Sequence, residues 1–276
     1  MTPEEEFAQK RAQAEQLIRQ YAPQRLQEQL ISLLRPAIAL TATRTDDAQI
    51  PVGASKFGGA PDVPDDFEWP MWNGKPLGFL AQIDLEEVAP FDVEEVLPKS
   101  GLLSFFYEVD EPNWTDVATP GSWRVFLFDR SVRRARVDRE TEFFPASICF
   151  SAGWSSASTF NGSSDDDSEW MWRSNVSPCV STGKVPYQGH QMLGYGSPIV
   201  VDPAWYAERR SHPTKDEFDV QPSPEDVHQW ILLFQLDSDY EINTMWGDVG
   251  TLYFMIRRED LQARRFDQTW MELEYT

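Results

Sequence analysis

The sequence is poor in the residues that most often carry metal and thiol chemistry. It has two cysteines, Cys149 and Cys179, and three histidines among 276 residues. It contains no C-x-x-C pair, and no histidine stands near either cysteine, so the sequence indicates neither a zinc site nor a disulfide framework. We expect two buried thiols in a reducing compartment.

The sequence also lacks the short motifs of common enzyme classes. It has no Gly-x-Ser-x-Gly, no His-Glu-x-x-His and no dinucleotide-binding glycine pattern. Lys56 precedes Gly58 and Gly59, but the G-x-x-x-x-G-K pattern of a phosphate loop is missing. We therefore expect a tight glycine turn with a solvated lysine, and no cofactor; phosphate binding at Lys56 is the alternative.

Long apolar runs and positive charge are the other absences. No window approaches the roughly 18 apolar residues of a membrane span, and the first residues, Met1 to Glu6, are polar and acidic. Lys and Arg number 24 against 45 Asp and Glu, a net charge of -21. Such a field repels phosphate backbones and anionic lipid, which argues against nucleic-acid and membrane partners. We expect a cytoplasmic protein that suits a basic protein partner, or one whose charge serves solubility alone. Composition leaves the oligomeric state open.

Apolar material is ample, and it begins with a helical pattern. Hydrophobic residues make up 41% and aromatic residues 13% of the chain, enough for a core. Thr2, Pro3 and Glu5 have the pattern of a helix start with a capping box. A second helix is predicted to start at Pro23 and to stop at Pro36. Residues 1–36 thus predict a helical hairpin packed on the main body, with a docking arm as the alternative.

The rest of the chain contains an apparent internal repeat. An apolar run ending in Gln-x-Asp occurs at Phe79–Asp84 and again at Leu232–Asp237. Each is followed by Gly-x-Leu-x-Phe, at Gly101–Phe105 and Gly250–Phe254, and is preceded by Gly-x-Pro. Internal repeats of this kind predict a duplicated fold. We expect an α+β protein with antiparallel β-sheets in two related halves, 37–154 and 187–276, separated by a polar Ser/Asp-rich loop at 155–186.

Several strand properties follow from the pattern of apolar residues. Trp230–Leu236 is the most apolar strand and is predicted at the centre of the sheet. Trp270–Tyr275 alternates apolar residues with Glu272 and Glu274, which predicts an edge strand with its glutamates toward solvent.

The repeat places two Gln and Asp pairs at equivalent positions. Gln82 and Asp84 in the first copy match Gln235 and Asp237 in the second. A pseudo-twofold fold would bring the carboxylates together in a symmetric cleft suited to acid–base chemistry. The plainer interpretation is that the glutamines satisfy loop backbone groups and that Asp84 caps a helix. His190, near the second glycine loop, is either a structural histidine or a base.

The segment after Asp237 partly resembles a calcium-binding loop. Asp237, Asp239, Glu241 and Asp248 supply oxygen ligands at suitable spacing, but Ile242 stands where such a loop needs glycine. We expect no metal, these four residues being the weak candidates, and a solvated turn is the alternative. The complete set of candidate ligand-binding residues is Lys56, Gln82, Asp84, His190, Gln235, Asp237, Trp246 and Asp248; the sequence identifies no catalytic residue.

These motifs resemble the bacterial YwqG-like family, a domain of unknown function. The resemblance rests on Lys56–Pro61, Leu80–Asp84, Gly101–Phe105, His190–Gly194 and, most specifically, Leu232–Phe254. It implies an antiparallel α+β protein in two related halves, bacterial and cytoplasmic, with no established activity or site residues. Some relatives lie near polymorphic toxin genes, which implies an immunity or accessory role.

The sequence therefore favours a non-enzymatic module that binds a protein or a small ligand. Enzymatic activity is the less favoured interpretation. The alternative is a metal-assisted hydrolase that uses the Asp237–Asp248 carboxylates with His190 or Asp84. A scaffold without a small-molecule site is the third reading.

Overall fold

The computed structural model describes residues 1–109, 119–129, 131–135, 143–156, 189–212 and 220–275. Most of the predicted Ser/Asp-rich loop at 155–186, with Cys179, lies outside these residues. The boundary between the two expected halves therefore stays a prediction.

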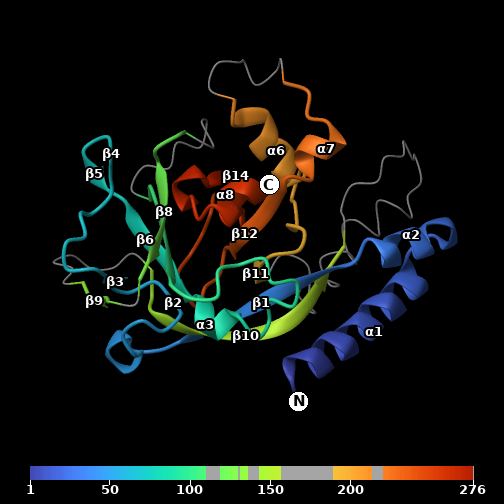
Figure 1. The fold of residues 1–276 in the computed structure, drawn as a ribbon, viewed down its shortest axis with the longest axis horizontal. Helices are drawn as coiled ribbons and strands as arrows, with labels where there is room; N and C mark the ends of the chain where they lie inside the picture. The colour runs from blue at the N-terminus through green and yellow to red at the C-terminus, as the bar shows by residue number, and fades with distance from the viewer. Residues whose placement is uncertain (110–118, 130, 136–142, 157–188, 213–219, 276) are drawn as a thin grey trace.

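One large antiparallel sheet dominates the fold. Its ten strands run in the order β14-β13-β12-β11-β1-β10-β2-β6-β7-β8 (Figure 1). The strands are β1 (Arg35–Arg44), β2 (Lys56–Phe57), β6 (Gly78–Asp84), β7 (Leu102–Tyr107), β8 (Trp123–Phe128), β10 (Ala146–Ser155), β11 (His190–Met192), β12 (Trp230–Asp237), β13 (Thr251–Arg257) and β14 (Trp270–Glu274). Two small ribbons pair β3 (Asp62–Val63) with β9 (Arg133–Arg134) and β4 (Met71–Trp72) with β5 (Lys75–Pro76).

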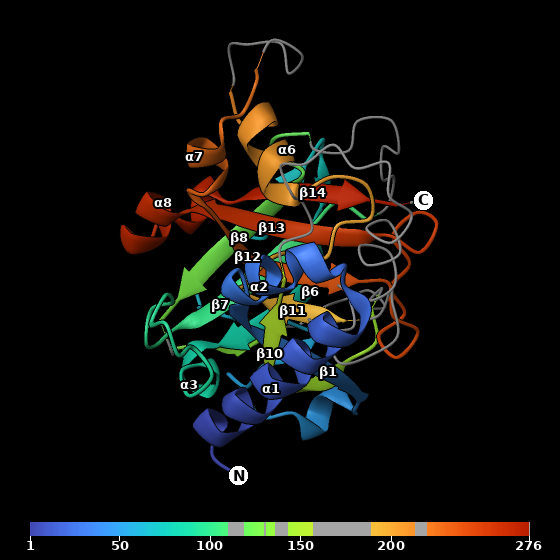
Figure 2. The same cartoon turned by 90° about the vertical axis from the view of Figure 1, so that its right-hand side faces the viewer.

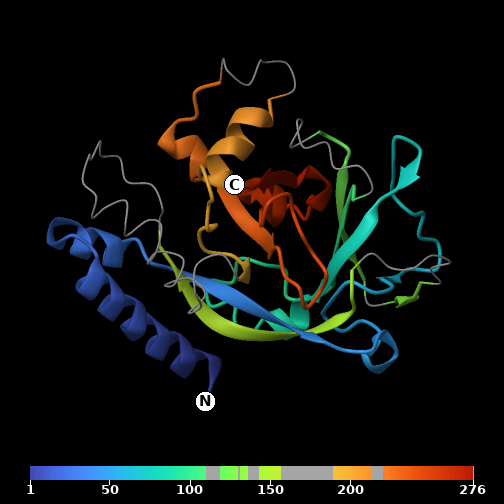
Figure 3. The ribbon, with the colours of Figure 1, turned by 180° about the vertical axis from the view of Figure 1, so that it is seen from behind.

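The sheet curls until its two end strands approach each other. The long β1–β10 pair forms the floor, and the remaining strands rise on either side of it (Figures 1 and 3). Trp123 on β8 donates its Nε1–H to the carbonyl of Thr269, just before β14, at 2.7 Å. The result is a nearly closed, barrel-like sheet, and the predicted α+β class with antiparallel strands is confirmed.

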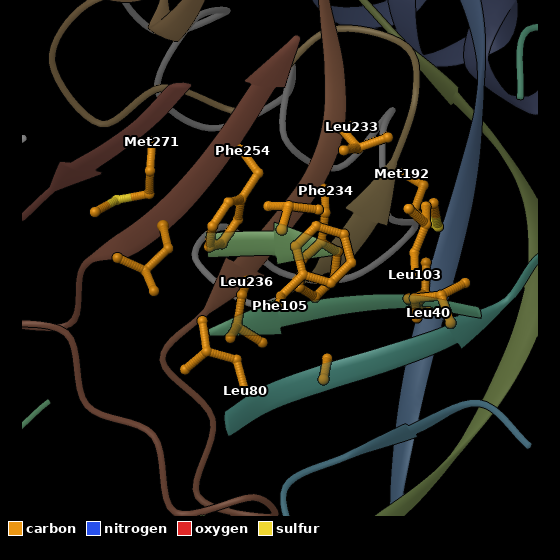
Figure 4. Close-up of a cluster of buried hydrophobic side chains, with 14 of the residues drawn as sticks. Leu40, Leu80, Leu103, Phe105, Met192, Leu233, Phe234, Leu236, Phe254 and Met271 are labelled. Atoms are coloured by element: carbon orange, nitrogen blue, oxygen red, sulfur yellow. The ribbon is translucent and has the colours of Figure 1, made fainter. Parts of the chain in front are cut away.

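The interior of the curled sheet is an aromatic and aliphatic core. Phe234 on β12 lies 4.7 Å from Phe105 on β7 and 6.1 Å from Phe254 on β13, measured between ring centroids. Figure 4 shows these rings with aliphatic side chains that converge on them from strands facing each other across the interior of the curled sheet. Burial of each such side chain contributes about 1.5–3 kcal/mol. Strands from both ends of the chain therefore share one core.

The centre of the sheet is not β12, contrary to the prediction. The middle strands are β1 and β10, and β12 is the third strand from one end. Every residue of β12 is nevertheless buried, because helix α6 (Pro203–Arg210) covers its outer face while the core covers the inner one. A strand covered on both faces reads as a continuous apolar run wherever it stands in a sheet.

The N-terminal residues form one long helix and one short one outside the sheet. Helix α1 (Pro3–Tyr21) has the predicted capping box between Thr2 and Glu5. It packs on β10, where Trp154 donates its indole N–H to the carbonyl of Phe7 at 2.9 Å (Figure 2). The predicted second helix consists of η1 (Gln24–Leu26) and the six-residue α2 (Gln27–Ser32). Pro36 does not stop it, because β1 already begins at Arg35.

Two predictions about burial were wrong. Cys149 lies on β10 as an exposed free thiol. Glu272 and Glu274 on β14 are buried, with 1% and 6% of their surface exposed. Strand β14 does end the sheet as predicted, but helix α6 and the segment before it cover its outer face.

In the part of the chain that the structure describes, the remaining helices are short connections. They are η2 (Asp47–Gln49), α3 (Leu85–Val88), α7 (Pro224–Val227), α8 (Arg258–Gln262) and η5 (Phe266–Gln268). Over the described residues, no helix has both the length and the apolar character needed to cross a membrane.

Candidate functional site

Lys56 is the buried cation of a charge network beside the first glycine loop. Its side chain is 0% exposed, and Nζ donates to Asp47 Oδ1 at 2.6 Å and to the carbonyl of Ala60. Arg134 donates to the same Asp47 oxygen at 3.0 Å and to Asp62 Oδ1 at 2.6 Å. Burial lowers the pKa of Lys56, and the hydrogen bond to Asp47 opposes that change. The predicted solvated lysine is therefore wrong, because Asp47 on η2 supplies the countercharge and the glycine loop supplies the Ala60 carbonyl.

Gln82 fastens this loop to the sheet from β6. Its Oε1 accepts a hydrogen bond from the Asp62 backbone N–H at 2.8 Å. Its Nε2 donates to the Ala54 carbonyl at 2.8 Å and to Asp62 Oδ2 at 2.7 Å. Gln82 is fully buried, so all its hydrogen-bonding capacity is directed at the protein itself.

Gln235, on β12, likewise fastens a loop to the sheet. Its Oε1 accepts from the Ser197 backbone N–H at 3.0 Å, and its Nε2 donates to the Gly189 carbonyl at 3.1 Å. The third bond runs from Nε2 to Asp237 Oδ1, also at 3.0 Å. Gln235 pairs across the sheet with Gln191, and the carbonyl that it bonds, Gly189, lies two residues before that partner. Gln82 pairs with Lys56, and its carbonyl acceptor, Ala54, likewise lies two residues before that partner. The two glutamines thus hold two loops in the same way.

The two loops also share their backbone conformation. Gly58 and Gly59 have φ values of 53° and 68°, and Leu193 and Gly194 have 58° and 69°. A Cβ at Gly58 would lie 2.5 Å from the Phe144 carbonyl oxygen. Glycine is therefore required there both by the positive φ angle and by this close contact. The left-handed pair turns each loop back over the strand that precedes it.

Asp84 and Asp237 do not form one cleft. Their strands, β6 and β12, are separated in the sheet by β2, β10, β1 and β11. Asp84 caps α3 by accepting from the Glu86 N–H at 3.0 Å. Asp237 accepts from the Gly189 N–H at 2.6 Å and from Thr251 Oγ1 at 3.0 Å. Burial raises the pKa of Asp237, and the neighbouring His190 and these donors oppose that change.

His190 is engaged at both ring nitrogens. Nδ1 accepts a hydrogen bond from the Asp237 backbone N–H at 3.2 Å, so the ring proton is assigned to Nε2. Nε2 lies 3.1 Å from Asp239 Oδ2 and donates to it. The ring also packs against Phe57, with centroids 4.6 Å apart. Both nitrogens are bonded to the protein itself, so His190 links β11 to β12 and to the turn at Asp239.

The four carboxylates of the supposed calcium loop do not converge. Asp237 is buried, Asp239 is half-buried, and Glu241 and Asp248 are exposed. Asp239 Oδ1 accepts from the Glu241 N–H at 2.8 Å, a turn-forming bond. Across the described part of the chain, no group of three or more His, Cys, Asp or Glu residues is arranged to hold a metal ion.

Trp246 lies at the end of this turn, packed in the core. Its ring contacts Phe143, with centroids 5.5 Å apart, and Tyr107 at 6.1 Å. Its buried indole nitrogen has no hydrogen-bond partner. The structure therefore brings Gln235, Asp237 and His190 into one bonded group and links Gln82 to Lys56 through Asp62, Arg134 and Asp47, while Trp246 packs in the core.

Replacing either glutamine tests this structural role. Gln82→Ala and Gln235→Ala should each lower the free energy of unfolding by about 2–3 kcal/mol, because each leaves buried loop groups without a partner. Chemical denaturation measures the loss, and Gln229→Ala, at an exposed glutamine on the surface, is the matched control. A loss no larger than that of the control would show that the loops do not depend on these bonds.

A second charged cluster, which sequence patterns did not indicate, lies between α6 and the outer face of the sheet. Glu272 on β14 accepts from Arg210 Nη1 at 2.7 Å and from Trp270 Nε1 at 2.6 Å. Glu208 on α6 accepts from Arg257 at 2.6 Å and from Trp230 Nε1 at 2.9 Å. The charges pin α6 to the sheet. The alternation that predicted exposed glutamates could not reveal them, because the covering helix comes from elsewhere in the chain.

Glu272 should make stability fall as pH rises. Burial raises its pKa to about 7 from the usual 4.5, with Arg210 acting in opposition. Below pH 4.5 the carboxyl is neutral in both folded and unfolded states; between 4.5 and 7 only the unfolded chain gives up its proton, which favours unfolding. The Glu272→Gln variant should therefore gain stability relative to the unmodified chain across this window, by up to about 3 kcal/mol.

Denaturant titrations of both proteins from pH 4.5 to 8 measure this difference. The pH dependence that comes from other titratable groups cancels when the two unfolding free energies are subtracted, because both proteins carry those groups. A difference in unfolding free energy that is independent of pH would contradict a raised pKa at Glu272.

Comparison with known proteins yields a family and no activity. A search of curated proteins finds no match. The YwqG-like resemblance stays an expectation from the sequence motifs. The model of a family described as a domain of unknown function, DUF1963, matches residues 55–274. This region includes both Gln82 and Gln235 and all strands of the large sheet except β1. The chain belongs to the DUF1963 family of domains of unknown function.

Proposed function

We propose that this chain is a non-enzymatic binding protein for a basic protein partner. The observation that carries the proposal is the net charge of -21 on a chain with 45 acidic residues. Opposite charge speeds and orients association between proteins. The candidate polar residues support the same reading, since Lys56, Gln82, Gln235 and His190 are all bonded to the protein itself. A basic toxin neutralised by this chain is one partner of this kind, in line with the resemblance noted above.

We also propose that the fold arose by duplication of a five-strand unit. Beside the central β1–β10 pair, β2-β6-β7-β8 lie on one side and β11-β12-β13-β14 on the other, in the same relative order. Both β6 and β12 have an irregularity in register at the corresponding place, between Phe79 and Ala81 and between Leu232 and Phe234. An experimental structure in which the two units superpose with Gln82 and Gln235 out of register would contradict duplication.

Thermal-shift measurements with the products of neighbouring genes test the binding function. Each product is added separately, with divalent metal ions as parallel samples. A basic product at 100 times its Kd should stabilise the chain by about 2.7 kcal/mol. The shift should weaken as salt is added, because screening reduces the attraction between exposed charges.

Two results would overturn the proposal. One is stabilisation by a metal ion that Asp237→Ala or Asp248→Ala abolishes, which would favour the metal-assisted hydrolase. The other is a protein partner whose binding does not change with salt concentration.

A further inference from the structure

The two end strands of the sheet are joined at one end and open at the other. Trp123, the first residue of β8, packs against Trp270 on β14 with ring centroids 5.3 Å apart. Further along β8 an open groove of about 370 Å³ separates the strand from η5. Its lining includes the apolar side chains of Val125, Leu127 and Phe266 together with charged side chains. We call this groove, between β8 and η5, the seam of the barrel-like sheet.

The backbone of β8 has hydrogen-bond capacity facing this seam. In the part of the chain that the structure describes, the ladder of Val125–Phe128 pairs with β7, and no further backbone bond extends from these four residues toward η5. An antiparallel strand with one neighbour leaves alternate N–H and C=O groups on its other edge, and such an edge can pair with another chain.

The groove is bordered by more negative than positive charge. Asp129 and Asp267 contribute carboxylates, and Arg264 contributes one guanidinium. The guanidinium lies 3.4 Å from the Ser100 carbonyl oxygen, to which it donates. With a net charge of -21 on the whole chain, an incoming segment with lysine or arginine side chains is electrostatically favoured.

We propose that the groove between β8 and η5 binds an extended basic segment of a protein partner, which adds to the sheet as a strand beside β8. Main-chain hydrogen bonds to Val125–Phe128 supply affinity, and alternate side chains of the segment meet the apolar side chains of the groove. The other side chains reach Asp129 and Asp267. This inference rests on the proposed function and states where the partner binds.

The test uses the full chain and an eight-residue peptide of alternating valine and lysine. A peptide of alternating valine and glutamate controls for charge, and the valine-lysine peptide N-methylated on one edge controls for main-chain pairing. Binding is measured by fluorescence anisotropy, and protection of the Val125–Phe128 amides by hydrogen exchange. The groove variant is Asp129→Asn with Asp267→Asn. Its matched control, Glu4→Gln with Glu225→Gln, removes two exposed charges from α1 and α7.

The valine-lysine peptide should bind and protect the β8 amides. N-methylation should weaken binding at least about 10-fold, because it removes the main-chain donors. The groove variant should weaken it about 3- to 10-fold and the control variant should leave it unchanged.

Equal binding of the N-methylated peptide, or equal effects of the two variants, would overturn the seam as the docking site. Binding of a basic partner to the acidic surface would survive that result, so the two proposals fail separately. Absence of peptide binding, together with a partner that binds the groove variant normally, would also overturn the seam.

Discussion

Asp47→Ala is expected to lower the free energy of unfolding by about 3–5 kcal/mol, the usual cost of breaking a buried ion pair. The Asp47 carboxylate accepts from Lys56, Arg134 and the Ala60 backbone N–H. Without it, the fully buried Lys56 ammonium has lost its nearest countercharge. Chemical denaturation measures the loss.

Two further variants separate charge from packing. Asp46→Ala, at the exposed residue just before Asp47, removes a helix-capping carboxylate and should cost about 1 kcal/mol. Adding Lys56→Met to Asp47→Ala should restore much of the stability, because an apolar side chain of similar length needs no countercharge. If the double variant is less stable than Asp47→Ala alone, the cost does not come from an uncompensated lysine.

Phe234→Ala should also cost about 3–5 kcal/mol, through a cavity at the centre of the core. Phe234 is 0% exposed. Its ring contacts Phe57 on β2 and Phe105 on β7, across the interior, and Phe254 on the neighbouring strand β13. The same change at Phe150, which is only partly buried and pairs with Phe91 at the edge of the core, should cost less.

The shape of the unfolding curve carries additional information. Because Phe234 joins strands from both ends of the chain, the variant should still unfold in one cooperative step at a lower denaturant concentration. Two separate transitions, with the cavity affecting only one of them, would contradict a core shared by both ends.

Local sequence signals located most of the elements. The capping box at Thr2 and Glu5 depends on contacts three residues apart, so it is visible in the sequence and α1 begins where expected. The strands expected at Trp230–Leu236 and Trp270–Tyr275 are β12 and β14, each with its start at the expected residue. The repeated Gln-x-Asp pattern even indicated the two glutamines that fasten the loops, since each bonds a loop close to its own strand partner.

Tertiary structure alone decided where the charged residues lie. Lys56 and Glu272 both looked solvated because their immediate neighbours permit it. Each is buried beside a countercharge that its immediate neighbours do not supply: Asp47 on η2 pairs with Lys56 and also with Arg134, which comes from distant β9, and Arg210 on helix α6 pairs with Glu272. The separation of Asp84 from Asp237 has the same origin, since four strands drawn from both ends of the chain lie between β6 and β12.

The sequence by itself thus determined the antiparallel α+β character, the start of α1, the core-forming strands and the acidic charge, all of which depend on composition or on residues close together in the chain. Only the tertiary structure decided that these strands form a single curled sheet with an open seam between β8 and η5. Strand order and ion pairing depend on residues far apart in sequence, and a residue's own neighbours do not specify which distant segment will cover it.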